Sequence, residues 1–166
     1  MSATRTPSQV LQRLVDATNA HDLDGLVDCF AADYQLTDPV HPARSFSGAR
    51  QVRKNWATAF AAFPDIRLDV DQQAVTDAGF WLEAAQVGTR YDGMHLDARM
   101  VLIATVASGR IAAAHIYVSP VEPGGPDIDA VFAAMAGTTP PTPVDASTDR
   151  TERQDPAVPA PRGGAS

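Results

Sequence analysis

Apolar residues recur at intervals of three and four in three segments of the N-terminal half, which is the spacing of a helix with one buried face. The first segment begins at Pro7, the second follows a capping Asp22, and the third ends at Pro64. The inner faces of these predicted helices consist of Val10, Leu11, Leu14, Val15 and Thr18, then Leu23, Leu26, Val27 and Phe30, then Val52, Trp56, Ala59, Phe60 and Phe63.

Alternating apolar and polar positions predict strands in the rest of the first 120 residues. Tyr34 to Asp38 is a short predicted strand that ends at two prolines, and residues 66–71 alternate as in a half-buried strand. Asp92-Gly93 predicts a two-residue turn between strands 80–91 and 94–106, and Ser108-Gly109 predicts a second turn. The predicted class is α+β, with helices first and mainly antiparallel strands after them.

The two predicted turns fix a strand register. If each turn has two residues, Glu83 faces Leu102 and Leu102 faces His115. One sheet face then carries Trp81, Glu83, Val87, Met100, Leu102, His115 and Tyr117, and the other carries Phe80, Leu82, Gln86, Asp97, Arg99, Val101, Ile103, Ile116 and Val118. Both faces are rich in apolar groups, so we expect one on the helices and the other in a homodimer interface. A one-residue bulge would exchange the faces.

The composition changes after Pro120. Glu122 to Pro126 reads as a linker, and the apolar residues of 128–135 predict a short docking helix. Residues 137–166 contain almost no large apolar side chain, which is typical of disorder. The expected organisation is a disordered N-terminus over 1–7, a folded domain over 8–121, a linker and docking helix over 122–136, and a disordered tail over 137–166.

Charge and cysteine content exclude several classes of function. A net charge of −7 leaves no basic stripe for displacing counterions from phosphates, so no nucleic-acid partner is expected. The single cysteine, Cys29, excludes an internal disulfide and a thiolate metal cage, and its apolar neighbours indicate a buried thiol. No apolar run approaches the ~20 residues of a membrane helix, and no Lys/Arg-led apolar segment opens the sequence. We therefore expect a cytoplasmic protein with no membrane partner.

Asp38 is the first candidate for chemistry, because it ends a short strand between the predicted helices and the predicted sheet. A general base at this place needs a pKa raised by an apolar pocket, so that it can remove a carbon-bound proton. The alternative is an Asp that only turns the chain before proline, which is a common use of this residue. Both interpretations remain open.

Glu83, His115 and Tyr117 form a second candidate group, because the predicted register places them on one face. Glu83 interrupts an apolar strand that is covered on both faces, and a buried carboxylate needs a partner. His115 is two strands away, about 9.6 Å between backbones, so the two side chains can share a ligand or a water. Tyr117 can donate a hydrogen bond to a ligand carbonyl. A structural or interface pair is the alternative.

Several stretches match a known pattern: Asn19 to Val27 with Phe30 to Asp33, Ser47 to Arg53, Phe63-Pro64-Asp65, Gly88-Thr89-Arg90 and Gly109-Arg110-Ile111. Together with the element order they resemble the nuclear transport factor 2-like superfamily, in its SnoaL-like and ketosteroid isomerase-like branches. The resemblance covers residues 8–121 and implies a cone of three N-terminal helices on a curved sheet that encloses a pocket. It implies no single activity, because relatives include isomerases, polyketide cyclases, epoxide hydrolases, dehydratases and proteins without catalysis.

At the catalytic positions of these related families, this sequence keeps only some of the functional residues. Asp38-Pro39 corresponds to the general base of the ketosteroid isomerases, but their two oxyanion donors fall on Leu14 and on Met100 or Val101. Steroid isomerisation by that route is therefore not expected. Of the constellation of the limonene epoxide hydrolase-like relatives only the arginine, Arg99, is kept. The last-strand Asp of the cyclases corresponds to Ser119 or Ile116.

In the cone fold that the resemblance implies, side chains that face the core also line the pocket. The candidate ligand-binding residues are Leu14, Trp56, Phe60, Trp81, Met100 and Arg99. Arg99 faces solvent or an interface if the Asp92-Gly93 turn is tight, and it faces the pocket if a bulge shifts the register. His95, Asp97 and Arg99 alternate on one strand face, but no second ligand set accompanies them, so neither a metal nor a cofactor is expected.

The leading hypothesis is cofactor-free acid/base isomerisation or cyclisation of a small lipophilic, polyketide-like carbonyl compound by a homodimer. Asp38 would act as base, His115 and Tyr117 as proton donor or oxyanion stabiliser, and Glu83 in support. The second hypothesis is a non-catalytic module of the same fold that binds a small molecule or mediates oligomerisation. The two differ in whether Asp38, Glu83 and His115 line one cavity.

Overall fold

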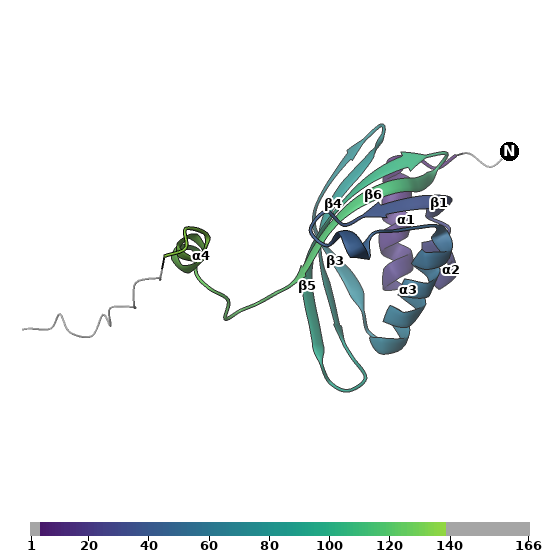
Figure 1. Cartoon of the computed structure of the whole chain (residues 1–166). Helices are drawn as coiled ribbons and strands as arrows, with labels where there is room; N and C mark the ends of the chain where they lie inside the picture. The colour runs from purple at the N-terminus through teal and green to yellow at the C-terminus, as the bar shows by residue number, and fades with distance from the viewer. Residues whose placement is uncertain (1–3, 139–166) are drawn as a thin grey trace, which may run out of the picture. The chain divides into compact units, whose positions relative to one another are not determined.

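The structure, a computed structural model, describes residues 4–138 and divides into two units, Met1–Pro123 and Gly124–Ser166. The first unit contains three α-helices and a six-stranded sheet (Figure 1). Its elements are α1 (Pro7–Asn19), α2 (Leu23–Val27), β1 (Phe30–Thr37), the 3₁₀ turn η1 (Pro42–Arg44), β2 (Phe46–Ser47), α3 (Ala49–Ala62), β3 (Arg67–Thr76), β4 (Gly79–Thr89), β5 (His95–Ala107) and β6 (Arg110–Pro120).

The strands form one curled sheet in the order β2-β1-β6-β5-β4-β3. All neighbouring strands are antiparallel except β1 and β6, which run parallel. Helices α1 and α3 lie on the same face of the sheet (Figure 1). The α+β class and the mainly antiparallel sheet are confirmed. Among residues 4–138 no helix has both the length and the apolar character needed to cross a membrane.

Local sequence signals explain the helix boundaries. Thr6 caps α1 in a capping box with Gln9, since each side chain bonds the other residue's backbone N–H. Asp22 caps α2 by accepting from the backbone N–H of Gly25. Gly48, with φ at +89°, precedes α3 in a conformation that L side chains rarely adopt.

The connection between α1 and α2 is tied to β3 by side chains. Asn19 donates to the carbonyl of Leu68 at 3.1 Å and accepts from its N–H at 2.8 Å, as a neighbouring strand would. The His21 ring lies 2.8 Å from the carbonyl oxygen of Ile66 and stacks on Phe60 with ring centroids 4.7 Å apart. These contacts hold the helices at one edge of the sheet and give His21 a structural role.

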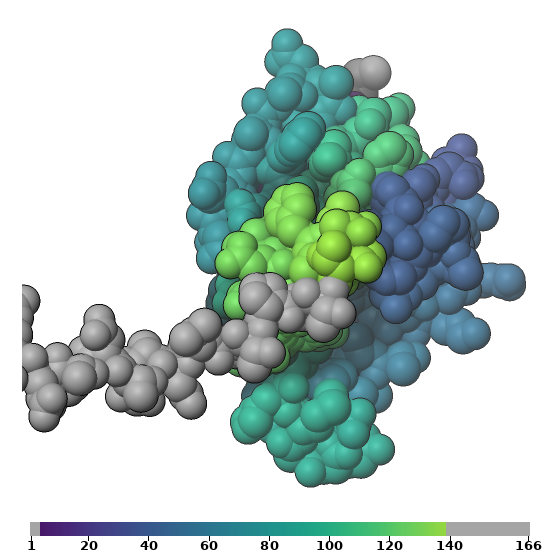
Figure 2. Space-filling view, turned by 60° about the vertical axis from the view of Figure 1, so that its left-hand side comes forward, coloured from purple at the N-terminus to yellow at the C-terminus, as the bar shows by residue number. Residues whose placement is uncertain are grey.

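The register of the long strands differs from the prediction by one residue. The β4–β5 ladder closes at Thr89 and His95, so that the connection has five residues instead of two and projects as a lobe (Figure 2, lower edge). Glu83 therefore pairs with Val101 instead of Leu102. The Ser108-Gly109 turn has two residues as predicted, but a bulge between Thr105 and Val106 shifts the β5–β6 ladder.

This shift exchanges the faces, because successive side chains point to opposite sides of a strand. Leu82, Leu102 and Ile116 now form one row on the helix side. Glu83, Val101 and Tyr117 form a row on the opposite face, and the neighbouring row there is Trp81, Ile103 and His115. The predicted face assignment is therefore wrong for β4 and β6 relative to β5.

The core of the first unit lies between the helices and this inner sheet face. Its largest fully buried side chains include Phe80, Leu26, Ile66, Leu82 and Ile111. Cys29 is completely buried, its thiol lies 3.4 Å from the carbonyl oxygen of Gly25, and burial raises its pKa to about 11. The predicted structural thiol is confirmed.

The second unit contains α4 (Ile128–Met135), capped by Asp127 through the backbone N–H of Ala130. Its large apolar side chains are Ile128, Val131, Phe132 and Met135, as expected for the short helix of this segment. A docking role for this helix remains a prediction. The predicted tail lies outside the described residues from position 139 onward.

Candidate ligand pocket

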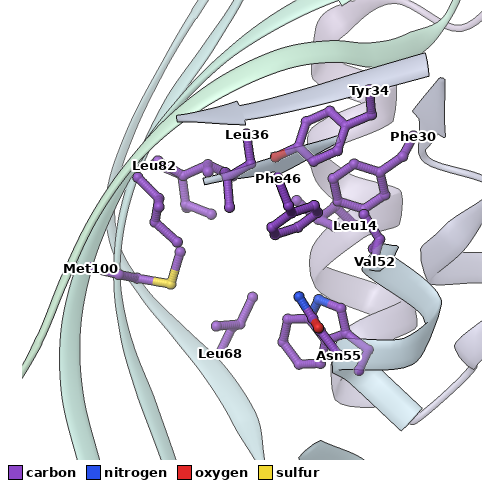
Figure 3. Close-up of a pocket in the computed structure, with 13 residues that line it drawn as sticks. Leu14, Phe30, Tyr34, Leu36, Phe46, Val52, Asn55, Leu68, Leu82 and Met100 are labelled. Carbon is purple, nitrogen blue, oxygen red and sulfur yellow. The ribbon is translucent and has the colours of Figure 1, made fainter. Parts of the chain in front are cut away.

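A cavity of about 180 Å³ lies between the inner sheet face and the helices (Figure 3). Strand residues form one wall and helix residues the other, and three aromatic rings lie at one end. The lining consists of Leu36, Leu68, Leu82, Met100, Leu102 and Ile116 from the sheet, Leu14, Val52, Asn55 and Trp56 from α1 and α3, and Phe30, Tyr34 and Phe46.

The observed strand register determines which strand residues line the sheet side of the cavity. The row of Leu82, Leu102 and Ile116 crosses three neighbouring strands, and Met100 reaches from β5 toward the cavity. Because strand residues two apart share a face, the alternation of β5 places Met100 and Leu102 together. The result is an apolar surface with no charged side chain among the lining residues.

Two polar side chains interrupt this apolar lining. Tyr34 is 2% exposed, and its hydroxyl has no hydrogen-bond partner among residues 4–138. Burial holds the pKa of Tyr34 well above its ordinary value, so that the group stays a neutral donor. Asn55 is exposed and accepts from the amide of Gln51 through its oxygen at 2.7 Å. Its own NH₂ group remains available to a ligand.

The sequence predicted part of this lining. Leu14, Trp56 and Met100 line the cavity, whereas Phe60 packs behind Trp56 with ring centroids 5.5 Å apart. Tyr34 and Asn55 were missed. Strand alternation could have found Tyr34, because it lies two residues before Leu36 on the same face of β1.

Five predicted site residues lie on the outer sheet face instead of in the cavity. Trp81 is 55% exposed there, and Arg99 lies 3.5 Å from Asp71 in an exposed ion pair. Glu83 and His115 are both exposed, and Tyr117 is 40% exposed. The structure does not bring this group together with Asp38, and none of Asp38, Glu83 and His115 lines the cavity. The catalytic hypothesis built on these three residues therefore loses its basis. The five-residue turn and the bulge are the reason, because either one reverses which face a strand presents.

Asp38 is 2% exposed at the end of β1 and is not among the lining residues. One carboxylate oxygen, Oδ1, accepts from the backbone N–H groups of Val40 at 3.1 Å and His41 at 2.8 Å. Its own N–H donates to the hydroxyl of Ser45 at 3.0 Å. These are the contacts of an Asp that turns the chain, the alternative interpretation given above. A base role for Asp38 stays a prediction.

Comparison with known proteins identifies the family. A family model for the SnoaL-like domain matches residues 11–114, which is most of the first unit. The chain belongs to the SnoaL-like family. A search of curated proteins found no match. Among residues 4–138 no three His, Cys, Asp or Glu side chains gather as a metal site would require.

Solved structures share the fold of this SnoaL-like chain at low sequence identity. A hypothetical protein of Catenulispora acidiphila with a ketosteroid isomerase-like fold, in complex with trimethylamine, has a TM-score of 0.58 and 16% identity, over 80% of this chain and 95% of its own. IdmH of Streptomyces antibioticus, a candidate polyketide cyclase, has a TM-score of 0.59 and 21% identity, over 68% and 91%. AclR of Streptomyces galilaeus, a candidate hydroxylase, has a TM-score of 0.60 and 18% identity, over 68% and 88%.

Proposed function

We propose that the pocket binds a small lipophilic carbonyl compound and supports cofactor-free acid/base chemistry on it. The observation that carries this proposal is the combination of an apolar cavity with two uncommitted donors, the Tyr34 hydroxyl and the Asn55 amide. An apolar ligand with one acceptor oxygen would fill the cavity and accept a hydrogen bond from the Tyr34 hydroxyl.

The volume limits the size of the ligand. An engineered apolar cavity of about 150 Å³ in another protein holds benzene, and the present cavity has about 180 Å³. A one-ring or compact two-ring compound fits this space. One end of a longer molecule also fits, if the rest of that molecule extends into solvent beside the exposed Asn55. The trimethylamine bound by the Catenulispora protein is also a small molecule. Polyketide-like aromatic ketones are therefore the ligand class we favour.

Tyr34 also gives the proposed chemistry a starting point. When a proton leaves the carbon next to a carbonyl, negative charge develops on the carbonyl oxygen. A neutral hydroxyl in an apolar site stabilises that charge more strongly than water does. Tyr34 would thus act as the oxyanion donor of an isomerisation or cyclisation. A chain that only binds its ligand is the alternative, and turnover of a bound ketone distinguishes the two.

Tyr34→Phe tests the donor. The variant should bind α-tetralone about tenfold more weakly than the wild type, because one hydrogen bond to the carbonyl is lost. Tetralin has nearly the same shape without the oxygen, and it should bind both proteins equally. Titrations by calorimetry measure both ligands. Equal loss for tetralone and tetralin would show that the hydroxyl only shapes the pocket.

We also propose that the chain forms a homodimer through the outer sheet face. Trp81 and Tyr117 are exposed there beside half-buried Val101 and Ile103, so that large apolar groups gather on neighbouring strands. Patches of this kind mark interaction sites.

Trp81→Glu tests the interface. Sedimentation velocity should show a dimer for the wild type. The dissociation constant of the dimer should rise at least about 30-fold for the variant, because a tryptophan that the proposed interface would bury is replaced by a charge. Tyr91→Glu is the matched control, since Tyr91 is 80% exposed in the β4–β5 connection, away from this patch. A monomeric wild type, or equal weakening by both substitutions, would refute this interface.

A further inference from the structure

The loop between β1 and β2 carries an acid–imidazole pair that the fold does not explain. Asp38 and His41 are three residues apart, and Asp38 Oδ2 lies 3.5 Å from His41 Nδ1. The carboxylate is 2% exposed, whereas the imidazole side chain is 41% exposed. His41 Nδ1 is buried without a hydrogen-bond partner, the one side-chain polar atom in this condition among residues 4–138.

The carboxylate is held in place for this contact. Oδ1 of Asp38 is occupied by the backbone N–H groups of Val40 and His41, which leaves Oδ2 directed at the imidazole. The Ser45 hydroxyl accepts a hydrogen bond from the Asp38 N–H, which joins the two ends of the loop. A turn would need only the hydrogen bonds from the backbone N–H groups of Val40 and His41 to Asp38 Oδ1. A hydrogen bond from the ring Nδ1–H to this second oxygen would fix one tautomer of the histidine.

The loop that carries the pair connects two strands that contribute to the pocket lining. Leu36 and Phe46 pair directly across β1 and β2, and both line the cavity. The loop that carries the pair leaves β1 two residues after Leu36 and enters β2 at Phe46. The turn η1 follows His41 in this connection.

We propose that His41 is the acid/base residue of this pocket and that Asp38 is its positioning residue. When a ligand binds, the Nδ1–H would donate to Asp38 Oδ2, which would leave the free electron pair of Nε2 available to the ligand. The 3.5 Å separation is long for a hydrogen bond, as such contacts often are before a ligand binds. The inference rests on the proposed function, because His41 acts on the compound that the pocket holds.

The reaction balances without a co-reactant. Nε2 takes a proton from the carbon next to the carbonyl, and the electron pair of the broken C–H bond moves to the carbonyl oxygen, where the Tyr34 hydroxyl donates. The imidazolium that forms is stabilised by the Asp38 carboxylate. When the ligand is a β,γ-unsaturated ketone the anion is a dienolate, and return of the same proton to its γ-carbon regenerates His41 and leaves the conjugated isomer, with no net oxidation or reduction.

A probe reaction tests the pair without the natural substrate. 5-Nitrobenzisoxazole loses its ring C–H proton to a base; the C–H pair forms the nitrile and the N–O bond breaks to release a coloured phenolate. The full-length wild type should accelerate this reaction. His41→Gln should lower the rate about 100-fold, the scale of a positioned general base. His95→Gln is the matched control, an exposed histidine at the start of β5 whose ring nitrogen lies 3.4 Å from the Thr89 hydroxyl.

Asp38→Asn tests the positioning role, because asparagine keeps an Oδ1 acceptor for the loop. The rate should fall about tenfold, and nitrogen-15 NMR should show the His41 Nδ1–H tautomer of the wild type replaced by a mixture. α-Tetralone binding, measured on all variants, separates the two proposals. Equal rates in the wild type and His41→Gln with intact tetralone binding would overturn the His41 inference alone. A wild type that binds no tetralone would overturn the pocket proposal and this inference with it.

Discussion

Phe80→Ala should lower the free energy of unfolding by about 3–5 kcal/mol, whereas Trp81→Ala should change it by less than about 1 kcal/mol. Phe80 is 1% exposed and packs in the core, and Trp81, its neighbour on β4, is 55% exposed on the outer face. Removing the buried ring leaves a cavity that the surrounding side chains cannot fill. Truncating the exposed ring leaves none. Urea denaturation at low protein concentration, where association does not contribute, measures both.

This pair of variants tests the strand register directly. The register predicted from two-residue turns placed Trp81 with Leu102 on one face and Phe80 on the other; the structure pairs Leu82 with Leu102 and places Phe80 on the core side. Tyr91→Ala serves as a control for loss of an aromatic ring at an exposed site. A larger cost for Trp81→Ala than for Phe80→Ala would mean that the two-residue turn exists and that the pocket wall is built from the other set of side chains.

Sequence reasoning succeeded where a signal is local. The helix spacing placed α1 and α3, and Asp22 marked the start of α2, because caps and 3.6-residue periods depend only on neighbours in the chain. The buried state of Cys29 followed from its apolar neighbours in the same way. The order of helices and strands, together with short matching sequence stretches, indicated the family that the SnoaL-like match shows.

The pocket could not be predicted equally well, because it depends on register. Asp92-Gly93 is a strong hairpin signal, yet the chain forms a five-residue connection in which the Arg90 N–H donates to the Met94 carbonyl oxygen and the Gly93 N–H to the Arg90 carbonyl oxygen. A strand with apolar groups on both faces offers no alternation that would reveal the slip. The contact between Asp38 and His41 could not be predicted either, because it depends on the path of a loop, and a loop has no periodic pattern in the sequence.

Met100→Trp should abolish binding of α-tetralone, with an affinity loss of at least about 100-fold, which corresponds to about 2.7 kcal/mol. Met100 reaches into the cavity from β5 on the side of the sheet, and its thioether chain is 9% exposed (Figure 3). A rigid indole at this position would occupy the space that the ligand needs. The cavity already exists, so the larger side chain should cost less stability than it would in a close-packed core.

Met100→Leu provides the matched control, because it keeps an apolar side chain of similar volume and leaves the cavity open. It should retain tetralone affinity within about threefold. Calorimetric titration of the three proteins, with thermal unfolding to verify that each is folded, separates the outcomes. If Met100→Trp folds and still binds tetralone as the wild type does, the ligand occupies another site, and the assignment of Tyr34 and His41 to its recognition fails. Loss of binding in the tryptophan variant alone would place the ligand between Met100 and Asn55, in the space that the exchanged register created.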